Sequence, residues 1–372
     1  MLERTLKNLA ESRTVPIWWS SLLGKAARTS IFLTAEWMQS WLDTYAHDFA
    51  GQWVCWHVGD EIVGGCLLLT HTKRKWLFSL RSVYFNATGE ARDRTPLAEF
   101  NDVLFVEQYR QEIAQDLTQL LNLQAWDRLY FSGYEPGGVL HALCNLVPSA
   151  HLKNKIEAAA YIDLDALNGA SFEKTLSANT RSQLKRCRRH YVEQFGTITI
   201  DRAETTQAAL AYLNQLGILH NLRRASKGDV GAFESQVINK FHTRLIPYLF
   251  AAGHVDLLKI ASGSLPIGYL YNFVRNGKVY FFQSGFNFYS DPKMKPGLLA
   301  HTIAIQYYLE CGMKEYDFLA GDSQYKRSLA KQGRVLQWSV LYRENMRVRI
   351  MLALKKIVDR LLYRKSALNE SA

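Results

Sequence analysis

Short runs of alternating apolar and polar residues predict strands in both halves of the chain, with glycine-containing turns between them. The pattern of a strand, a turn and a second strand occurs in WVCWHVGDEIVGGCLLL (53–69), where Gly64 and Gly65 open the second strand. It recurs in VDLLKIASGSLPIGYLYNF (255–273), with Gly268 in the equivalent place. We therefore expect one α/β unit to occur twice in this chain.

A second pair of segments supports the repeat. A helix end, a short apolar strand and a glycine follow one another in AWDRLYFSGYE (125–135) and again in MKEYDFLAGDS (313–323). The first unit is expected at about 28–150 and the second at about 156–343. The stretch between them, ALCNLVPSAHLKNK (142–155), is expected to be their connection.

The tail, residues 344–365, has the spacing of an amphipathic helix, and basic residues occupy most of its polar side. The apolar face consists of Met346, Ile350, Leu354, Ile357 and Leu361. We expect this face to pack on the protein's own sheet. An anionic membrane surface is the alternative partner, which would make the contact with the membrane peripheral.

The two units differ at the helix that follows their third strand. In the second unit the strand KVYFFQSGFNFY (278–289) leads to a helix over 298–311, and Lys293, Lys295 and Gly297 precede that helix. Free N–H groups and basic side chains at a helix start favour a phosphorylated carrier.

In the first unit the comparable stretch, FNDVLFVEQYRQEIAQDLTQLL (100–121), has no glycine and carries Glu107 and Glu112 in its opening turns. A carboxylate there repels a phosphate. We therefore expect only the second half to bind the carrier, with the first half as a scaffold or as the wall of the acceptor groove.

Composition narrows the class of protein. The chain has 372 residues, is 48% hydrophobic and carries a net charge of +11, which is typical of a globular protein with an anionic partner: nucleic acid, membrane surface or phosphorylated small molecule. We expect neither a membrane span nor a signal peptide. The five cysteines have no paired spacing, which favours a reducing, cytoplasmic location and gives no metal site.

Three segments resemble the FemAB-like branch of the GNAT acyltransferases, and most closely the acetyltransferases associated with cellulose and exopolysaccharide synthesis. These segments are GFNFYSDPKMKPGLLAHTIAIQYYLECGMKEYDFLAGDSQYKRSLA (285–330), SANTRSQLKRCRRHYVEQFG (177–196) and FLTAEWMQSWLDTY (32–45). The resemblance implies a mixed α/β fold of two tandem GNAT units, an acyl-CoA donor such as acetyl-CoA, and an amine or hydroxyl acceptor. Related Fem-type enzymes instead take aminoacyl groups from aminoacyl-tRNA.

One departure concerns the loop that binds the pyrophosphate in this superfamily. Here it reads Lys-Met-Lys-Pro-Gly-Leu-Leu, with Gly297 as its single glycine and Leu298 where the family has a second small residue. Lys293, Lys295, Gly297 and Leu298 are still the expected pyrophosphate site. The resemblance places the carrier's arm between two splayed strands, 278–286 and 315–319, where backbone groups near Gln283 and Ser284 would bind it.

The chemistry of acyl transfer then points to the end of the second of these strands. Lys326 is expected to stabilise the developing oxyanion, and Tyr325 to protonate the leaving thiolate. Asp317 is a candidate base or would orient Lys326. For each there is a structural alternative: a surface lysine, an aromatic ring packed under the sheet, and a carboxylate that binds turn N–H groups.

Two further groups are candidates for acceptor binding. Within the helix over 181–189, Arg181, Lys185 and Arg189 share one face, which would bind phosphate or an anionic acceptor; a solvated charged face is the alternative. Asp322 would bind substrate or cap a short helix at 323–330. We expect His301, one turn into the helix, to be structural.

The leading hypothesis is an acyl-CoA-dependent N- or O-acyltransferase that acts on a small amine, a sugar nucleotide or a polysaccharide precursor. An aminoacyl-tRNA-dependent Fem-type transferase is the second hypothesis, and the positive charge suits it. The third is a non-catalytic accessory protein of a polysaccharide synthase.

Overall fold

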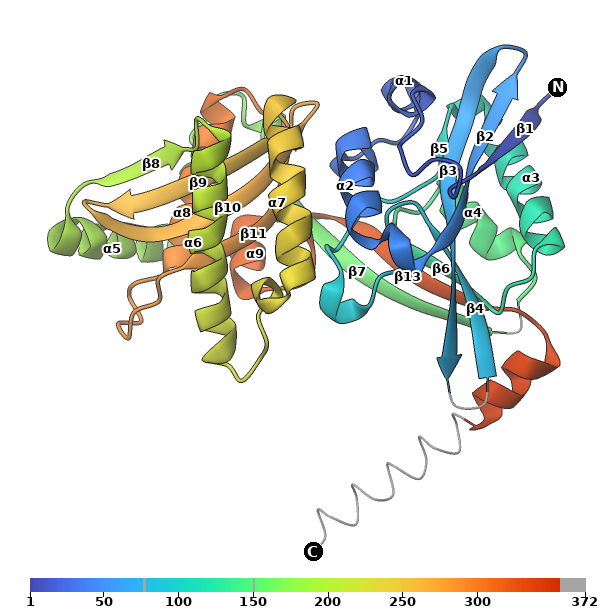
Figure 1. The fold of residues 1–372 in the computed structure, drawn as a ribbon. Coiled ribbons are helices and arrows are strands. Elements are labelled where there is room, and N and C mark those ends of the chain that lie inside the picture. The colour runs from blue at the N-terminus through green and yellow to red at the C-terminus, as the bar shows by residue number, and fades with distance from the viewer. Residues whose placement is uncertain (76–77, 150, 355–372) are drawn as a thin grey trace, which may run out of the picture.

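The structure is a computed structural model that describes residues 1–75, 78–149 and 151–354, so 355–365 of the predicted tail helix lie outside it. Within the described residues, thirteen strands form one mixed sheet in the order β1-β2-β3-β4-β6-β13-β7-β12-β11-β10-β9-β8, and β5 pairs with β3 (Figure 1). The strands are β1 Glu3–Asn8, β2 Ala50–Val58, β3 Glu61–Lys75, β4 Phe78–Phe85, β5 Leu104–Phe105, β6 Arg128–Tyr134, β7 His151–Asp163, β8 Ile198–Arg202, β9 Val255–Ser262, β10 Leu265–Arg275, β11 Lys278–Phe286, β12 Glu315–Ala320 and β13 Gln332–Tyr342.

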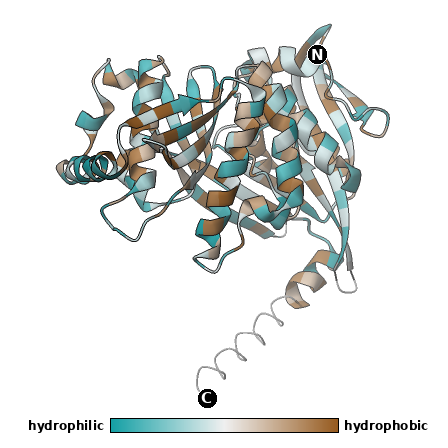
Figure 2. Ribbon diagram, turned by 60° about the vertical axis from the view of Figure 1, so that its left-hand side comes forward, coloured by the Kyte–Doolittle hydropathy of each residue, from teal (hydrophilic) through white to brown (hydrophobic). Residues whose placement is uncertain are grey.

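Helices cover both faces of this sheet. They are α1 Trp18–Lys25, α2 Ala35–Tyr45, α3 Arg110–Leu123, α4 Val139–Leu146, α5 Ala178–Phe195, α6 Thr206–Ala225, α7 Gln236–Ala251, α8 Pro296–Glu310 and α9 Gln324–Leu329. The first-half helices α1 and α2 share one apolar core with α6 and α7, while α3 and α4 cover the opposite face of the first half and α5 and α8 that of the second. Figure 2 shows apolar residues on the strands beneath these helices.

The element order repeats once, as expected from the sequence. Each half has a first strand (β1 or β8), two helices, three more antiparallel strands, a helix, a fifth strand (β6 or β12) parallel to the fourth, a short helix and a final strand. The second half has the additional helix α5 before β8, and the first half the additional two-residue strand β5. One extra residue bulges just before the matching glycine in both halves, Val63 before Gly64 and Ile267 before Gly268. The mixed α/β class and the equivalence of these two glycines are confirmed.

The final strands of the two halves are exchanged. Strand β7 ends the first repeat but pairs with β12 of the second, and β13 ends the second repeat but pairs with β6 of the first. The two exchanged strands also pair with each other from Gln332–Tyr161 to Tyr342–His151. The expectation of a connection at 142–155 is wrong, because α4 and the start of β7 occupy most of that stretch.

A second contact joins the halves on one face of the sheet, where α2 packs against α7. The Trp37 and Phe241 rings there lie 5.0 Å apart, edge to face. Trp37 and Phe241 are both fully buried. The two repeats therefore share a sheet and a core. None of the helices described has the length and apolar character that a bilayer span requires.

This sharing predicts how the protein unfolds. Residues 1–150 produced alone leave β6 without β13 and α2 without α7, and an open strand edge is a site of aggregation. We expect the full chain to unfold in one calorimetric transition and the fragment to show no cooperative transition. Two separate transitions in the full chain, or a cooperative fragment with native-like circular dichroism, would contradict this.

Candidate functional site

The parallel strands β11 and β12 separate partway along their length. They pair only from Lys278–Glu315 to Tyr280–Asp317. Beyond these pairs β11 follows β10, with a bulge at Phe282, and β12 follows β7. In this fully described region no ladder pairing joins β11 after Tyr280 to β12 after Asp317. The backbone edges that face each other across this splay are therefore placed to bind an extended ligand.

The equivalent splay of the first half is filled by its own chain. Strands β4 and β6 pair only from Ser82–Arg128 to Tyr84–Tyr130. Asn101, which is buried, then bridges the two edges: its backbone N donates to Gly133 O (3.1 Å) and its Nδ2 donates to Phe85 O (3.1 Å). An extended ligand cannot enter between these strands, because Asn101 already satisfies their backbone groups.

A bulge in β12 carries unusual backbone geometry. Asp317 pairs with Tyr161 of β7 and Ala320 pairs with Ala159, so β12 has one more residue than β7 between these two pairs. Leu319 within this bulge has a φ of 59°. Such a left-handed conformation costs an L-residue roughly 1 kcal/mol or more. Strand β6 has a matching bulge at which Gly133 also has a φ of 59°. Gly133 thus corresponds to Leu319, not to Gly321 as the sequence pattern implied.

Charged groups from both halves meet at the peptide that follows this bulge. The backbone N of Ala320 donates to Glu99 Oε2 (2.8 Å), and Lys326 Nζ donates to the carbonyls of Ala320 (2.8 Å) and Leu319 (3.1 Å). Lys326 therefore lies at the strand-to-helix corner where the sequence placed it, with 8% of its surface exposed. Burial lowers the pKa of its ammonium. It is not a surface lysine.

Glu99 is a site residue that the sequence reasoning missed. It lies in the loop that fills the first splay, between Leu97 and Phe100, whose φ values are 57° and 50°. Backbone strain of this kind is concentrated at functional sites. Burial raises the pKa of Glu99 to about 7, although the bond from Ala320 and the charge of Lys326 oppose the shift. A carboxylate with such a pKa can take up a proton near neutral pH.

Asp317 has a different setting from the one expected for a base. Its side chain has no exposed surface, and its carboxylate lies 3.1 Å from Lys278 Nζ and 3.7 Å from an Arg334 nitrogen. Its other oxygen accepts from Leu319 N (2.7 Å). This carboxylate holds the bulge and shares Lys278 and Arg334 with the neighbouring Glu315, which lies 3.0 Å and 2.5 Å from the same two cations. The structure therefore favours the structural alternative for Asp317 and gives no support to a base.

Tyr325 packs in an aromatic cluster beneath the splay. Its ring stacks on His301 of α8 with 4.8 Å between centroids, and Phe281 of β11 and Phe318 of β12 complete the cluster. Burial raises the pKa of the Tyr325 phenol and lowers that of His301 to about 3. His301 is therefore a neutral, fully buried ring, as expected for a structural residue.

The start of α8 lies beside α5. No side chain caps this helix and no acidic residue occupies its first turn. Lys295 donates to Gln183 Oε1 (2.7 Å) from α5, whereas Lys293 is exposed. A Cβ on Gly297 would lie 3.2 Å from the Phe286 ring, so this glycine admits an aromatic neighbour; the Leu298 side chain is buried in the core.

The other predicted residues lie at the rim of this region. Ser284 N binds the side-chain oxygen of its neighbour Gln283 (3.0 Å), and both are partly exposed at the splay. On α5, Arg181, Lys185 and Arg189 are all exposed on one face, as predicted. Arg189 lies 3.8 Å from Glu193, and Arg181 donates to the Leu176 carbonyl. Neither Arg181 nor Lys185 has an ion pair within the described residues.

Asp322 forms an exposed ion pair with Arg327 of α9. The expectation that it caps the short helix is wrong, because Ser323 occupies the N-cap position. The exposed Asp322 carboxylate pairs with Arg327, and no hydrogen bond joins it to Lys326 within the described residues.

A cavity of about 410 Å³ opens next to Glu99 in the first half. Aromatic rings form part of its wall: Tyr84 stacks on Tyr130 with centroids 4.8 Å apart, and Trp338 of β13 lies nearby. Glu90 adds a second carboxylate, whose pKa burial raises. The cavity thus places an aromatic surface next to Glu99, whose carboxylate accepts from Ala320 N.

Comparisons with known proteins bear on both halves. Residues 178–327, from the first residue of α5 to just past Lys326, match the family model “Acetyltransferase (GNAT) domain”. A comparison with curated proteins finds no significant sequence match. The solved structure of FemX has a TM-score of 0.56 at 9% identity and covers 91% of this chain and 96% of its own. L-PGS from Bacillus licheniformis has a TM-score of 0.51 at 11% identity, with 92% and 96% covered.

At these identities the two structures show the fold alone. That fold extends over both halves, and the GNAT match lies in the second half, which holds the open splay and the uncapped start of α8.

The different settings of Asp317 and Asp322 predict different effects on stability. Asp317→Ala removes a fully buried carboxylate and leaves Lys278 and Arg334, both partly buried, with Glu315 as their one ion-pair partner among the described residues. This change should lower the free energy of unfolding by about 3 kcal/mol. The matched change Asp322→Ala breaks an exposed pair and should cost less than about 1 kcal/mol. Urea unfolding measures both. Equal effects of the two changes would contradict the structural role of Asp317.

Proposed function

We propose that the protein is an acyltransferase that moves an acyl group from acyl-CoA, in the simplest case acetyl-CoA, to an amine. The observation that carries this proposal is the contrast between the two splays: Asn101 bridges the edges of the first, whereas no described residue bridges β11 beyond Tyr280 to β12 beyond Asp317, next to the start of α8. The donor would lie in the second splay, with its phosphates at α8 between Lys293 and Lys295 and its arm beside Gln283 and Ser284.

The acceptor would lie in the cavity beside Glu99. Aromatic rings and carboxylates suit a cationic or sugar-bearing amine, because a ring face attracts an ammonium group and stacks on a sugar. A small amine, a sugar nucleotide with an amino group, or an amino sugar of a polysaccharide precursor would each satisfy this chemistry.

Two residues would act on the reacting atoms. Glu99 takes the proton that the amine loses, since its pKa of about 7 allows it to be charged at neutral pH. Lys326 places a positive charge at the end of β12, where charge develops on the acyl oxygen. The raised pKa of Tyr325 makes its phenol a weaker acid than a thiol, so Tyr325 would donate a hydrogen bond to the leaving sulfur and keep its proton.

A second candidate donor, aminoacyl-tRNA, is favoured by α5. Its exposed basic residues lie beside the start of α8, and Lys295 binds α5 directly through Gln183. The exposed basic residues of α5 are Arg181, Lys185, Arg186, Arg188 and Arg189. A phosphate backbone would bind such a surface with strong salt dependence.

Ligand-induced stabilisation tests the donor. A ligand at 100 times its dissociation constant adds about 2.7 kcal/mol to the free energy of unfolding, so CoA and acetyl-CoA should raise the melting temperature. Gly297→Glu should abolish the shift, because it puts a carboxylate at the phosphate site. Gly24→Glu is the matched control, since no atom lies within 4 Å of its Cβ position. If no acyl-CoA shifts the melting temperature and the protein binds tRNA in a salt-dependent way, aminoacyl-tRNA is favoured as the donor. If the protein binds neither acyl-CoA nor tRNA, a non-catalytic accessory protein is favoured.

The role of Lys326 is tested by turnover. Lys326→Ala should lower kcat about 100-fold, because it removes the charge that faces the acyl oxygen. Lys331→Ala, which removes an exposed lysine after the same helix, should leave kcat unchanged. A Lys326→Ala protein that melts like the original and turns over at the original rate would exclude the proposed role.

The role of Glu99 is tested by the pH dependence of kcat/KM. The rate should rise as the pH passes through about 7, and Glu99→Gln should lower it at least 100-fold and remove this rise. In the folded protein the pKa of Glu99 is raised from 4.5 to about 7. The protein should therefore lose stability as the pH rises from 4.5 to about 7, because folding disfavours the ionised carboxylate. Glu99→Gln should remove this loss of stability.

Asp102 offers the matched control for this experiment. Burial raises its pKa to about 7 as well, but its carboxylate accepts from the backbone of Val103 and Leu140, away from Ala320. Asp102→Asn should therefore change the pH dependence of stability and leave that of kcat/KM in place. If Asp102→Asn changes the pH profile of kcat/KM and Glu99→Gln leaves it unchanged, Glu99 is excluded as the base.

A further inference from the structure

The helix at 346–354, which follows β13, carries apolar residues on two opposite sides. Val348 and Met351 are buried and pack on Leu80 and Tyr342. A second stripe recurs every four residues and points away from that contact. It consists of Met346, Ile350 and Leu354, with 68%, 44% and 38% of their surfaces exposed. The expectation that this face packs on the protein's own sheet is therefore wrong for its described part; Figure 2 shows the apolar residues of this helix at the edge of the molecule.

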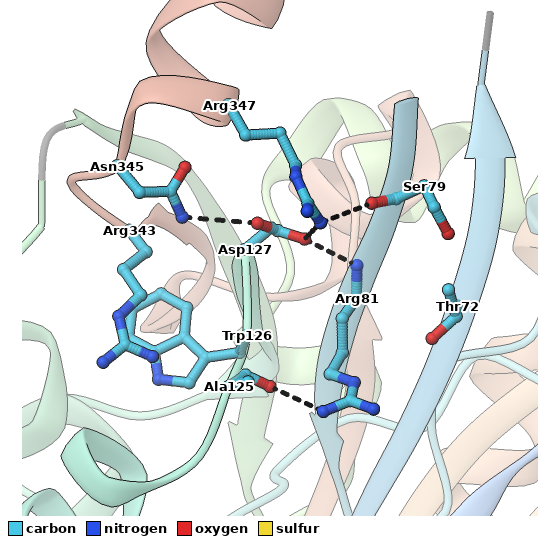
Figure 3. Close-up of a pocket in the computed structure, with 9 residues that line it drawn as sticks. All are labelled: Thr72, Ser79, Arg81, Ala125, Trp126, Asp127, Arg343, Asn345 and Arg347. Atoms are coloured by element: carbon cyan, nitrogen blue, oxygen red, sulfur yellow. Dashed lines mark hydrogen bonds and ion pairs between the residues drawn. The ribbon is translucent and has the colours of Figure 1, made fainter. Parts of the chain in front are cut away.

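A cavity of about 580 Å³ lies where this helix meets the first half of the sheet (Figure 3). Three arginines line it, from β4, from the end of β13 and from the helix. The lining residues are Thr72, Ser79, Arg81, Ala125, Trp126, Asp127, Arg343, Asn345 and Arg347. Asp127 is the single carboxylate among them, so the cavity carries two more positive than negative charges.

The protein's own groups hold these arginines in place but use only part of their donors. Arg347 donates to Ser79 O (3.1 Å) and lies 3.9 Å from Asp127, and Arg81 donates one long bond to Ala125 O (3.4 Å). Arg343 donates to Gln124 O (2.5 Å) and Asn122 O (3.1 Å) and lies against the Trp126 ring, 5.1 Å from its centroid (Figure 3). Because a guanidinium has five N–H groups, each arginine keeps donors for an oxyanion in the cavity.

The surface around the cavity is also basic. Arg74 pairs with Ser79 across β3 and β4, so its side chain shares the face of the cavity, and Arg349 is exposed on the helix. Glu344, between the end of β13 and this helix, is an exposed acidic residue. Five arginines thus outnumber two acids, Asp127 and Glu344, around an exposed apolar stripe. A stripe between cations is the arrangement of a helix that lies in a membrane interface.

We propose that this end of the molecule docks on an anionic phospholipid membrane. The arginine cavity binds a lipid phosphate, and Met346, Ile350 and Leu354 insert among the head groups. The cations alone would suit RNA equally well. The exposed apolar stripe favours a bilayer, because a nucleic acid would leave it in water while a bilayer buries it.

Vesicle co-sedimentation tests this surface, without any substrate of the proposed reaction. The full chain should bind vesicles of phosphatidylglycerol and phosphatidylcholine and should not bind vesicles of phosphatidylcholine alone, and salt should weaken the binding. Ile350→Asp and Arg81→Glu should each weaken it about tenfold. The matched controls Leu222→Asp on α6 and Arg13→Glu in the loop after β1 change residues exposed elsewhere and should bind normally.

Melting temperatures of all four variants separate lost binding from lost folding. Equal binding to both vesicle types, binding to neither, or normal binding by both Ile350→Asp and Arg81→Glu would overturn the proposal. Salt-dependent binding to RNA without binding to anionic vesicles would also overturn it and assign the basic surface to a nucleic acid.

Discussion

The exchange of β7 and β13 holds the two repeats of this protein together. Each strand leaves its own repeat and pairs with the fifth strand of the other, and the two lie side by side at the centre of the sheet. Their backbone hydrogen bonds fix how the halves are placed relative to one another. That placement brings a loop of the first half against β12 of the second, where Glu99 accepts from Ala320 N and Lys326 binds the carbonyl of the same residue.

The repeats have the same framework but different splays. Both fifth strands bulge at a residue with a φ of 59°, a glycine in the first half and Leu319 in the second. In the first half the loop that carries Asn101 satisfies the open edges and continues to Glu99. One segment thus closes one potential ligand site and supplies a carboxylate next to the other. Under the proposed function, this arrangement would give the duplicated unit a single active centre.

Much of this could be predicted from local sequence patterns. The strand–turn–strand segments, the equivalence of Gly64 and Gly268, the helix before β12 and the corner position of Lys326 follow from periodicity and turn residues. The strand exchange could not be predicted in this way. The sequences of β7 and β13 both indicate strands, and pairing between strands far apart in the sequence leaves no local pattern that identifies the partner. The same limit hid the ion pairs that make Asp317 a structural residue.

Glu99 was missed for a related reason. It lies in an irregular loop without periodicity, and its value comes from burial against a residue 221 positions away. The one local signal is that Glu99, Asn101 and Asp102 lie close together between apolar segments. Such polar residues are ordinary in a surface loop, and they become informative only because the structure shows them to be buried. The alignment of Gly133 with Gly321 failed because both glycines come near the end of a short apolar strand, whereas the matching bulges make Gly133 equivalent to Leu319.

The proposed function requires that the donor binds in the second splay and not in the first. Hydrogen exchange with mass spectrometry, with and without saturating CoA, resolves both splays in one experiment. CoA should slow exchange in residues 283–299 and 318–320 and leave exchange in residues 82–86 and 128–134 unchanged. Slower exchange in the first-half segments, or no change in either half, would contradict this requirement.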